Sequence, residues 1–325
     1  LAGTSIQARQ ILAATIGGSI QSSDELGVTI SSEYQTNTFN VSGNVGDNVT
    51  ITLGDLGSAN IGGDFGGDLT VNATIGARPN VTINGDMDGT ATFADSATLT
   101  VRGDFGTDSD SLARMDIHGN AHVTIQGDMH GDLVVGSRLE SLVADNYYDA
   151  NVFVGGRINS ISTTNTTTGN VVNSVFQAGL SAGDDGIFAD NIDTMPDVFE
   201  GGTLEKIVSF VAGNVSNSII AAGHDIDTFR ANTSISDSTV VSGFVLGHSA
   251  AASLLNSSNK ADHADISDDM SEIFGATTRT LYYGDLGTVY LGTATATNVN
   301  VIAGLDVGEN GVFGIIDDLE SRVLS

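Results

Sequence analysis

The stretch VTINGDMDG, residues 81–89, begins with a strand pattern and ends at a glycine–aspartate corner. Val81 and Ile83 alternate with polar residues, as in a strand that buries one face. LTVRGDFG at 99–106 and VTIQGDMHG at 123–131 repeat the same order of residues. A chain that returns to one strand-and-corner unit predicts a repeat protein, in which each unit packs against the next.

The corner glycine recurs through the first half of the chain at intervals of 20, 22, 18, 24 and 29 residues. A single short strand cannot bury its apolar face alone, but parallel stacking about 4.8 Å apart pairs the backbone and forms a continuous core. We therefore predict an all-β, single-stranded parallel β-helix (β-solenoid) of roughly 10–12 rungs. The corner glycines are Gly43, Gly63, Gly85, Gly103, Gly127 and Gly156.

At each corner, glycine permits a positive φ or a close backbone approach, and the adjacent Asp or Asn hydrogen-bonds its own turn. An antiparallel sandwich or barrel also has short strands, but it does not need the same corner every twenty-odd residues. A propeller blade takes about forty residues. The repeat length therefore favours the solenoid.

The repeat also predicts the domain organisation. Residues 1–36 are less regular and are expected to form an N-terminal cap or an inter-subunit segment, whereas 37–313 form the solenoid and 314–325 a C-terminal segment. KADHADISDDMSEIFG, residues 260–275, has apolar residues at helical spacing and predicts a short helical insertion. Neither terminus is strongly polar, although an uncapped β-helix end exposes a strand edge that can pair with another chain.

Composition excludes several classes of protein. Forty acidic residues against eleven basic ones give a net charge of −29, so nucleic acids and anionic membranes would be repelled. There is no cysteine for a disulfide, and no run of eighteen apolar residues for a membrane-spanning helix. LAGTSIQARQ lacks the regions of an export signal, which fits a cytoplasmic chain or a mature one. The acidic, β-rich composition favours a mature chain, extracellular or at the cell surface, after signal removal.

The segment LEKIVSFVAGNVSNSIIAAGHDIDTFRANTSISDSTVVSGFVLG, residues 204–247, resembles the glycine-rich β-strand repeats of large secreted surface proteins of planctomycete-type bacteria. The resemblance extends over about residues 37–313 and lies in the texture of the repeat, which unrelated adhesins share. It implies a parallel β-helix, export, and a role at the cell surface or in an extracellular fibre.

The corner carboxylates are the candidate metal ligands. Stacked on successive rungs, they would repel one another at a spacing of about 4.8 Å, and calcium or high salt would relieve the repulsion. Simple solvation is the alternative. GGDFGGD at 62–68 does not match the nonapeptide calcium repeat, because Phe65 replaces a glycine. Asp55 is a further stacked carboxylate, and the calcium ligands that we predict are Asp64, Asp86, Asp104 and Asp128.

Catalysis is the weaker hypothesis. Some parallel β-helices are polysaccharide lyases or hydrolases, and hydrolases need paired carboxylates roughly 5–9.5 Å apart. The acidic clusters outside the repeat read more simply as solvated turns, and three nearby histidines lack a recognised metalloenzyme spacing. We therefore predict no catalytic residue, and no cofactor other than calcium. The residues weighed are Asp184, Asp185, Asp190, Asp108 and Asp110, with His118, His122 and His130.

Two further sets of residues bear on partners. The tyrosine pairs 147–148 and 282–283, with Tyr34 and Tyr290, favour lateral protein contacts, since one ring of each pair must point out of a strand. Eight glycosylation sequons are expected on outward turns. Their asparagines are Asn40, Asn48, Asn72, Asn80, Asn165, Asn214, Asn232 and Asn256.

Together these features favour a structural subunit of an extracellular filament, sheath or surface layer. Its partner would be itself, joined head to tail by strand addition at the solenoid ends, with 1–30 as a candidate donated strand. One alternative is an adhesin or passenger rod of a larger surface protein, which would contact cell-surface glycans. A polysaccharide-active β-helix enzyme is the third reading.

Overall fold

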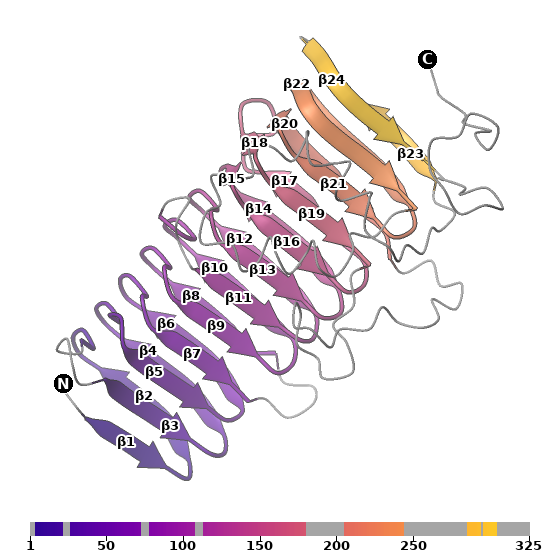
Figure 1. Cartoon of the computed structure of the whole chain (residues 1–325). Helices are drawn as coiled ribbons and strands as arrows, with labels where there is room; N and C mark the ends of the chain where they lie inside the picture. Colours follow the sequence, from indigo (N-terminus) through magenta and orange to yellow (C-terminus); the bar gives the residue numbers. More distant parts are fainter. Residues whose placement is uncertain are drawn as a thin grey trace. The chain divides into compact units, whose positions relative to one another are not determined.

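The computed structural model describes residues 4–21, 27–72, 78–107, 113–179, 205–243, 285–293 and 295–303. Within these ranges the chain consists of β-strands and tight corners, with no helix (Figure 1). It divides into two compact units, Leu1–Ala150 and Asn151–Ser325.

Each rung of the first unit has two strands and one single-residue bridge. The first series of strands forms one parallel sheet, which we call the first face. It comprises β2 (Ile11–Ile16), β4 (Thr36–Val41), β6 (Leu56–Ile61), β8 (Asn80–Ile83), β10 (Ala97–Val101), β12 (Ala121–Ile125) and β14 (Leu139–Ala144).

The second series forms another parallel sheet, the second face. It comprises β1 (Ser5–Ala8), β3 (Val28–Ser32), β5 (Val49–Leu53), β7 (Asp68–Val71), β9 (Thr90–Phe93), β11 (Arg114–Ile117) and β13 (Asp132–Val135). A column of parallel bridges, which we call the bridge column, closes the rungs. Its residues are Ile20, Val45, Phe65, Met87, Phe105, Met129 and Tyr147, the last in β15 (Tyr147–Tyr148).

The core of the first unit follows from the alternation in the sequence. In β8, Val81 and Ile83 are buried while Thr82 between them points outward, and the same buried–open–buried pattern recurs along both faces. β-branched residues suit such a half-buried pleated surface. The first-face partners from Phe39 to Val123 are offset by 20, 22, 18 and 24 residues, the same intervals as the corner glycines. The register is therefore the one that the glycine spacing predicts.

The second unit repeats the plan with longer strands. One sheet stacks β16 (Asn151–Val154), β19 (Val175–Ala178), β21 (Ile219–Ala222) and the end of β22 (Ile226–Ser242). The other stacks β17 (Ile161–Thr163) and β18 (Asn170–Val172), then β20 (Phe210–Ser216), β22, and finally β23 (Leu286–Tyr290) and β24 (Thr295–Ile302). Ile158, Ile207 and Ile226 form its bridges.

One corner of the second unit carries its own polar ladder. On four successive rungs, the residue at this corner has a positive φ; these residues are Asn173, Asn217, Asp237 and Asn298. Asparagine and aspartate tolerate this conformation. The amide of Asn217 donates to Oδ1 of Asn173 at 2.8 Å. Beside it, the buried Ser218 accepts the backbone N–H of Ser174 at 3.1 Å. Polar groups at this corner are therefore satisfied between rungs.

The predicted all-β parallel solenoid is confirmed. The described residues form a β-solenoid of about nine turns, close to the predicted 10–12 rungs. Within the predicted N-terminal segment 1–36, β1 pairs with β3 and β2 pairs with β4 in the parallel sheets of the first unit. The role of this segment as a cap or inter-subunit segment stays a prediction. The predicted helical insertion at 260–275 and the segment 314–325 lie outside the described residues.

Candidate functional site: the corner ladder and the open first rung

The repeated Gly-Asp corners of the first unit are joined by a chain of side-chain hydrogen bonds, which we call the corner ladder. Each corner residue accepts, through its side-chain oxygen, the backbone N–H of the corner residue on the next rung. From the first rung onward the N–H···O distances are 3.0, 3.2, 3.1, 2.8 and 2.7 Å. The ladder runs through Ser19, Asn44, Asp64, Asp86, Asp104, Asp128 and Asn146, whose amide donates to Asp128 at 2.7 Å.

The ladder exists because the backbone hydrogen bonds change direction at this corner. The N–H of Phe65 donates forward to the carbonyl of Asp86, whereas the N–H of Gly85 donates backward to the carbonyl of Gly63. Between these two directions, the N–H of Asp86 is left without a backbone acceptor. Oδ1 of Asp64 takes it at 3.1 Å. The aspartate therefore completes the backbone pairing that a turning chain would otherwise lose.

The glycine is needed because the preceding carboxylate lies where a Cβ would be. A Cβ on Gly85 would collide with Oδ1 of Asp64, and one on Gly103 or Gly127 would collide with the corner aspartate of the preceding rung in the same way. None of these glycines has a positive φ. Of the two predicted roles of the glycine, close approach is therefore the one that the structure shows.

The carboxylates of the corner ladder do not form a metal cage. Among the described residues, no group of three or more acidic or histidine side chains is gathered around a common point. The hydrogen-bonded role of Oδ1 is sufficient to explain why aspartate recurs at this corner. Calcium at Asp64, Asp86, Asp104 and Asp128 stays a prediction. Asp55 does not belong to the ladder, because it lies at the β5–β6 corner, where its carbonyl accepts the N–H of Thr36.

The other candidate residues are dispersed. His122 shares a 2.7 Å hydrogen bond with Ser141, and His130 stacks on Tyr148 at 5.4 Å. These contacts are separate, and among the described residues no group of three or more possible metal ligands includes either histidine. Asp108, Asp110, Asp184, Asp185 and Asp190 lie outside the described residues.

The tyrosines divide as the strand alternation requires. Tyr147 is fully buried, donates to the carbonyl of Leu142 at 3.3 Å, and has a pKa raised above its ordinary value by burial. Tyr148, its neighbour, points outward. Tyr34 and Tyr290 lie 5.3 Å from the guanidinium groups of Arg9 and Arg230, respectively. The pair 282–283 lies outside the described residues.

The sequons fall into two groups. Asn165, Asn214 and Asn232 already use their side chains in hydrogen bonds within the chain. Asn48 lies at a corner with φ of 56°, and Asn256 is outside the described residues. Glycosylation stays a prediction, and the outward group best placed for it is Asn40, Asn48, Asn72 and Asn80.

One titratable cluster was not found from the sequence. In the second unit, the N–H of His224 donates to the carbonyl of Glu205, and its Nδ1 lies 2.8 Å from Oδ1 of Asp225. That contact lacks hydrogen-bond geometry, and it is an ion pair only when the imidazole is protonated. Burial raises the pKa of Glu205 to about 7, and His224 opposes the shift.

The open first rung is the second feature of functional interest. Ile6 in β1 is 41% exposed, although its partner Ile30 on the next rung is 2% exposed. β1 pairs with β3 and β2 pairs with β4, and no other described strand lies on their outer edges. Among the described strands, the outer edges of β1 and β2 are therefore unpaired, and Ile6 lies uncovered beside them.

Comparison with protein-family models, with curated proteins and with solved structures found no match. Within the described ranges, no helix has the length and hydropathy needed to cross a membrane. The class of molecule is thus defined by its geometry as a parallel β-solenoid with a polar corner ladder.

The corner ladder predicts that the acceptor atom at Asp104 matters more than its charge. Asp104→Asn keeps an Oδ1 that can accept the N–H of Asp128, so we expect a free energy of unfolding within about 0.5 kcal/mol of the wild type. Asp104→Ala removes the acceptor and should cost roughly 1–2 kcal/mol. Urea unfolding measures both. An Asn variant as unstable as the Ala variant would show that the carboxylate itself is needed, as a bound cation would require.

Glu205 predicts a pH dependence of stability. Its folded pKa, raised to about 7, lies above the unfolded value of 4.5, so the stability that it contributes is present below pH 4.5 and is lost as the pH rises through 7. Because the group is half-exposed, we expect a loss of at most about 1 kcal/mol. Glu205→Gln should remove this loss, so that the variant becomes more stable than the wild type at pH 8 but not at pH 4. Equal pH profiles from urea unfolding would contradict the assignment.

Proposed function

We propose that this protein is a structural subunit that assembles head to tail, through the ends of its solenoid, into an extracellular filament, sheath or surface layer. The observation that carries the proposal is the first described rung, where Ile6 is exposed and the outer edges of β1 and β2 have no partner among the described strands. Stacking a further rung on it would pair the free edges of β1 and β2 and bury Ile6, as Ile30 is buried one rung further on. A strand edge of this kind is a template for another chain.

The far end of the second unit supports the same reading. β24 pairs with β22 alone among the described strands, and Val301 is 40% exposed. A contact between different ends of two copies is heterologous, so it propagates into a filament when it does not close into a ring. Export to the cell surface is part of the proposal and is supported by the acidic, cysteine-free repeat composition.

The test is electron microscopy of the purified chain, with calcium and then with a chelator. We expect long filaments of uniform width that shorten as the protein is diluted. Ile6→Glu places a charge in the proposed joint and should abolish filaments. Gln7→Glu adds the same charge on the same strand, but at an outward, exposed position, and should leave filaments intact.

Both variants should unfold at the same urea concentration as the wild type, since the substituted side chains are exposed. Filaments lost on chelation would assign a metal to the corner ladder. Isolated particles in both conditions would overturn the proposal, and the adhesin or passenger reading would then lead. Filaments that persist in Ile6→Glu would show that assembly does not use the first rung.

A further inference from the structure

Two rows of outward residues on the first face contain no Asp, Glu, Lys or Arg. These two ladders run along the face, one position on each of its seven strands. All fourteen residues are open to solvent at least in part. The ladders, which together we call the neutral face, are Ala13, Thr38, Ser58, Asn80, Thr98, His122 and Ser141, and Thr15, Asn40, Asn60, Thr82, Thr100, Thr124 and Val143.

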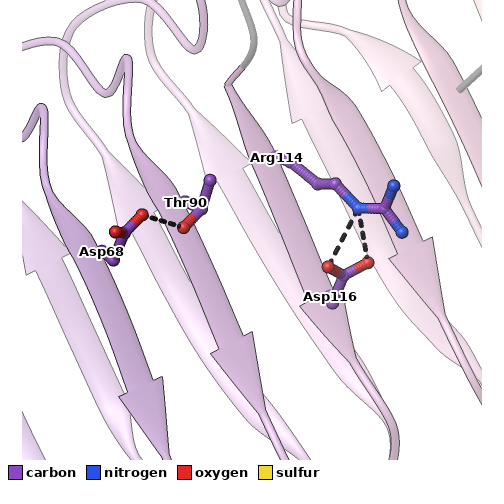
Figure 2. Close-up of polar contacts among 4 residues, drawn as sticks. All are labelled: Asp68, Thr90, Arg114 and Asp116. Carbon is purple, nitrogen blue, oxygen red and sulfur yellow. Dashed lines mark hydrogen bonds and ion pairs between the residues drawn. The ribbon is translucent and has the colours of Figure 1, made fainter. Parts of the chain in front are cut away.

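This composition contrasts with the rest of the first unit. Residues 1–150 contain nineteen acidic and five basic side chains, and none of them is in the two ladders. Glu140 in β14 lies at a register shift outside both ladders, 3.4 Å from Arg138. The second face is different. There, the hydroxyl of Thr90 donates a hydrogen bond to Asp68 at 2.6 Å, and Nε of Arg114 lies 2.9 Å from both carboxylate oxygens of Asp116 (Figure 2).

We propose that the neutral face is a lateral contact surface for a second copy of this chain. Chains with a net charge of −29 repel one another, and a surface without carboxylates is where that repulsion is weakest. Charged residues are likewise depleted at the cores of known interfaces. The first face is therefore suited to a contact between copies in a way that the second face is not.

The chemistry of the neutral face is self-complementary. Threonine and serine hydroxyls and asparagine amides each both donate and accept hydrogen bonds, so two copies related by a two-fold axis can satisfy each other. Threonine is stiff at χ1, which lowers the entropy cost of burying it. Some of these side chains are already fixed, since the amide of Asn84 donates to Asn60 at 3.1 Å. The two copies also share one rung spacing, so contacts repeat in register along the face.

The size of the neutral face determines how it is used. Seven strands about 4.8 Å apart and two ladders about 7 Å apart cover on the order of 400 Å² per copy. A stable pair needs about 800 Å² on each partner, so isolated chains should not dimerise through this face. In a filament the contact is repeated by every subunit, and the weak contacts add. The lateral contact therefore rests on the proposed filament, because only repeated contacts along it would be stable. Filaments that associate through this face would form a sheath or layer rather than single threads.

Cysteine cross-linking tests the contact directly, because the chain contains no cysteine. Thr82 lies on β8, the middle strand of the neutral face, where a two-fold axis would bring two copies of the same residue together. Thr70 lies on β7, the middle strand of the second face, and is its matched control. We expect Thr82→Cys in assembled protein to form disulfide dimers at least about tenfold faster than Thr70→Cys. The protein is produced in bacteria, so that Asn40 and Asn80 carry no glycan.

A second pair of variants separates this contact from end-to-end assembly. Thr82→Glu should leave single filaments that no longer associate side by side, whereas Thr70→Glu should leave the bundles intact. Equal cross-linking of the two cysteine variants would overturn the lateral contact, even with filaments present. If no filaments form, the proposed function fails, and the contact is measured in concentrated protein with the same variants. Retention on insoluble cellulose that Thr82→Glu abolishes, without selective cross-linking, would assign the face to a glycan and overturn the self-contact.

Discussion

Phe105→Ala is expected to lower the free energy of unfolding by about 3–5 kcal/mol, the usual cost of emptying a buried aromatic site. Phe105 is fully buried in the bridge column, between Met87 and Met129 on the adjacent rungs. Its ring also packs where a Cβ on Gly131 would lie. The corner backbone is fixed by hydrogen bonds to both adjacent rungs, so the cavity cannot collapse easily.

The matched control is Phe105→Met, because methionine already occupies the equivalent position on both neighbouring rungs. A volume-conserving exchange of this kind should cost less than about 1.5 kcal/mol. Urea unfolding gives the free energies, and hydrogen exchange should place the loss in β9 to β12, since a rung contacts only its neighbours. If the free energies of unfolding of the alanine and methionine variants agree within 1 kcal/mol, packing in the bridge column is not a main source of stability.

Gly85→Ala is expected to destabilise the protein by about 3 kcal/mol, although the glycine lies in an ordinary backbone conformation. The added Cβ would meet Oδ1 of Asp64, and would lie 2.8 Å from the backbone N of Asp64 and from the carbonyl carbon of Gly63. Those backbone atoms belong to the previous rung and cannot move alone. Gly17→Ala is the control, because nothing lies within 4 Å of its Cβ, and it should be neutral or slightly stabilising.

A double-mutant cycle with Asp64→Ala tests the link between the two residues of the corner. Removing the carboxylate relieves part of the clash, so the double variant should be more stable than the sum of the single losses, by about 1 kcal/mol or more. Thermal and urea unfolding both measure the cycle. Additive losses of stability would show that the glycine and the preceding aspartate act independently. That result would contradict the contact between them in the corner ladder.

The solenoid itself was predictable from the sequence because its determinants are local and repeated. Alternating residues such as Val81 and Ile83 specify one buried face, and the glycine intervals specify the rung length that the strand register then shows. Repetition makes the prediction strong, since each copy confirms the others. The pattern is weaker in the first thirty-six residues, so the sequence did not predict that β1, β2 and β3 pair with the strands that follow them.

The use of the corner aspartates was only partly predictable. The sequence showed that Asp64, Asp86, Asp104 and Asp128 are equivalent, but it suggested mutual repulsion and a cation. Only the tertiary structure shows that each Oδ1 points to the backbone N–H of the next rung. It also shows that Asp55 belongs to another corner, because the same residue type serves different turns at different places in the rung.

Sequence by itself determined the fold class, the rung length, the apolar faces and the charge of this protein, because these depend on which residues follow one another. Tertiary structure alone decided which residues lie one above another. It joined Gly85 to Asp64, placed Glu205 beside His224, left Ile6 uncovered among the described strands, and aligned fourteen residues without Asp, Glu, Lys or Arg on one face. Most of these relations join residues about twenty positions apart, so they exist only once the rungs are in register.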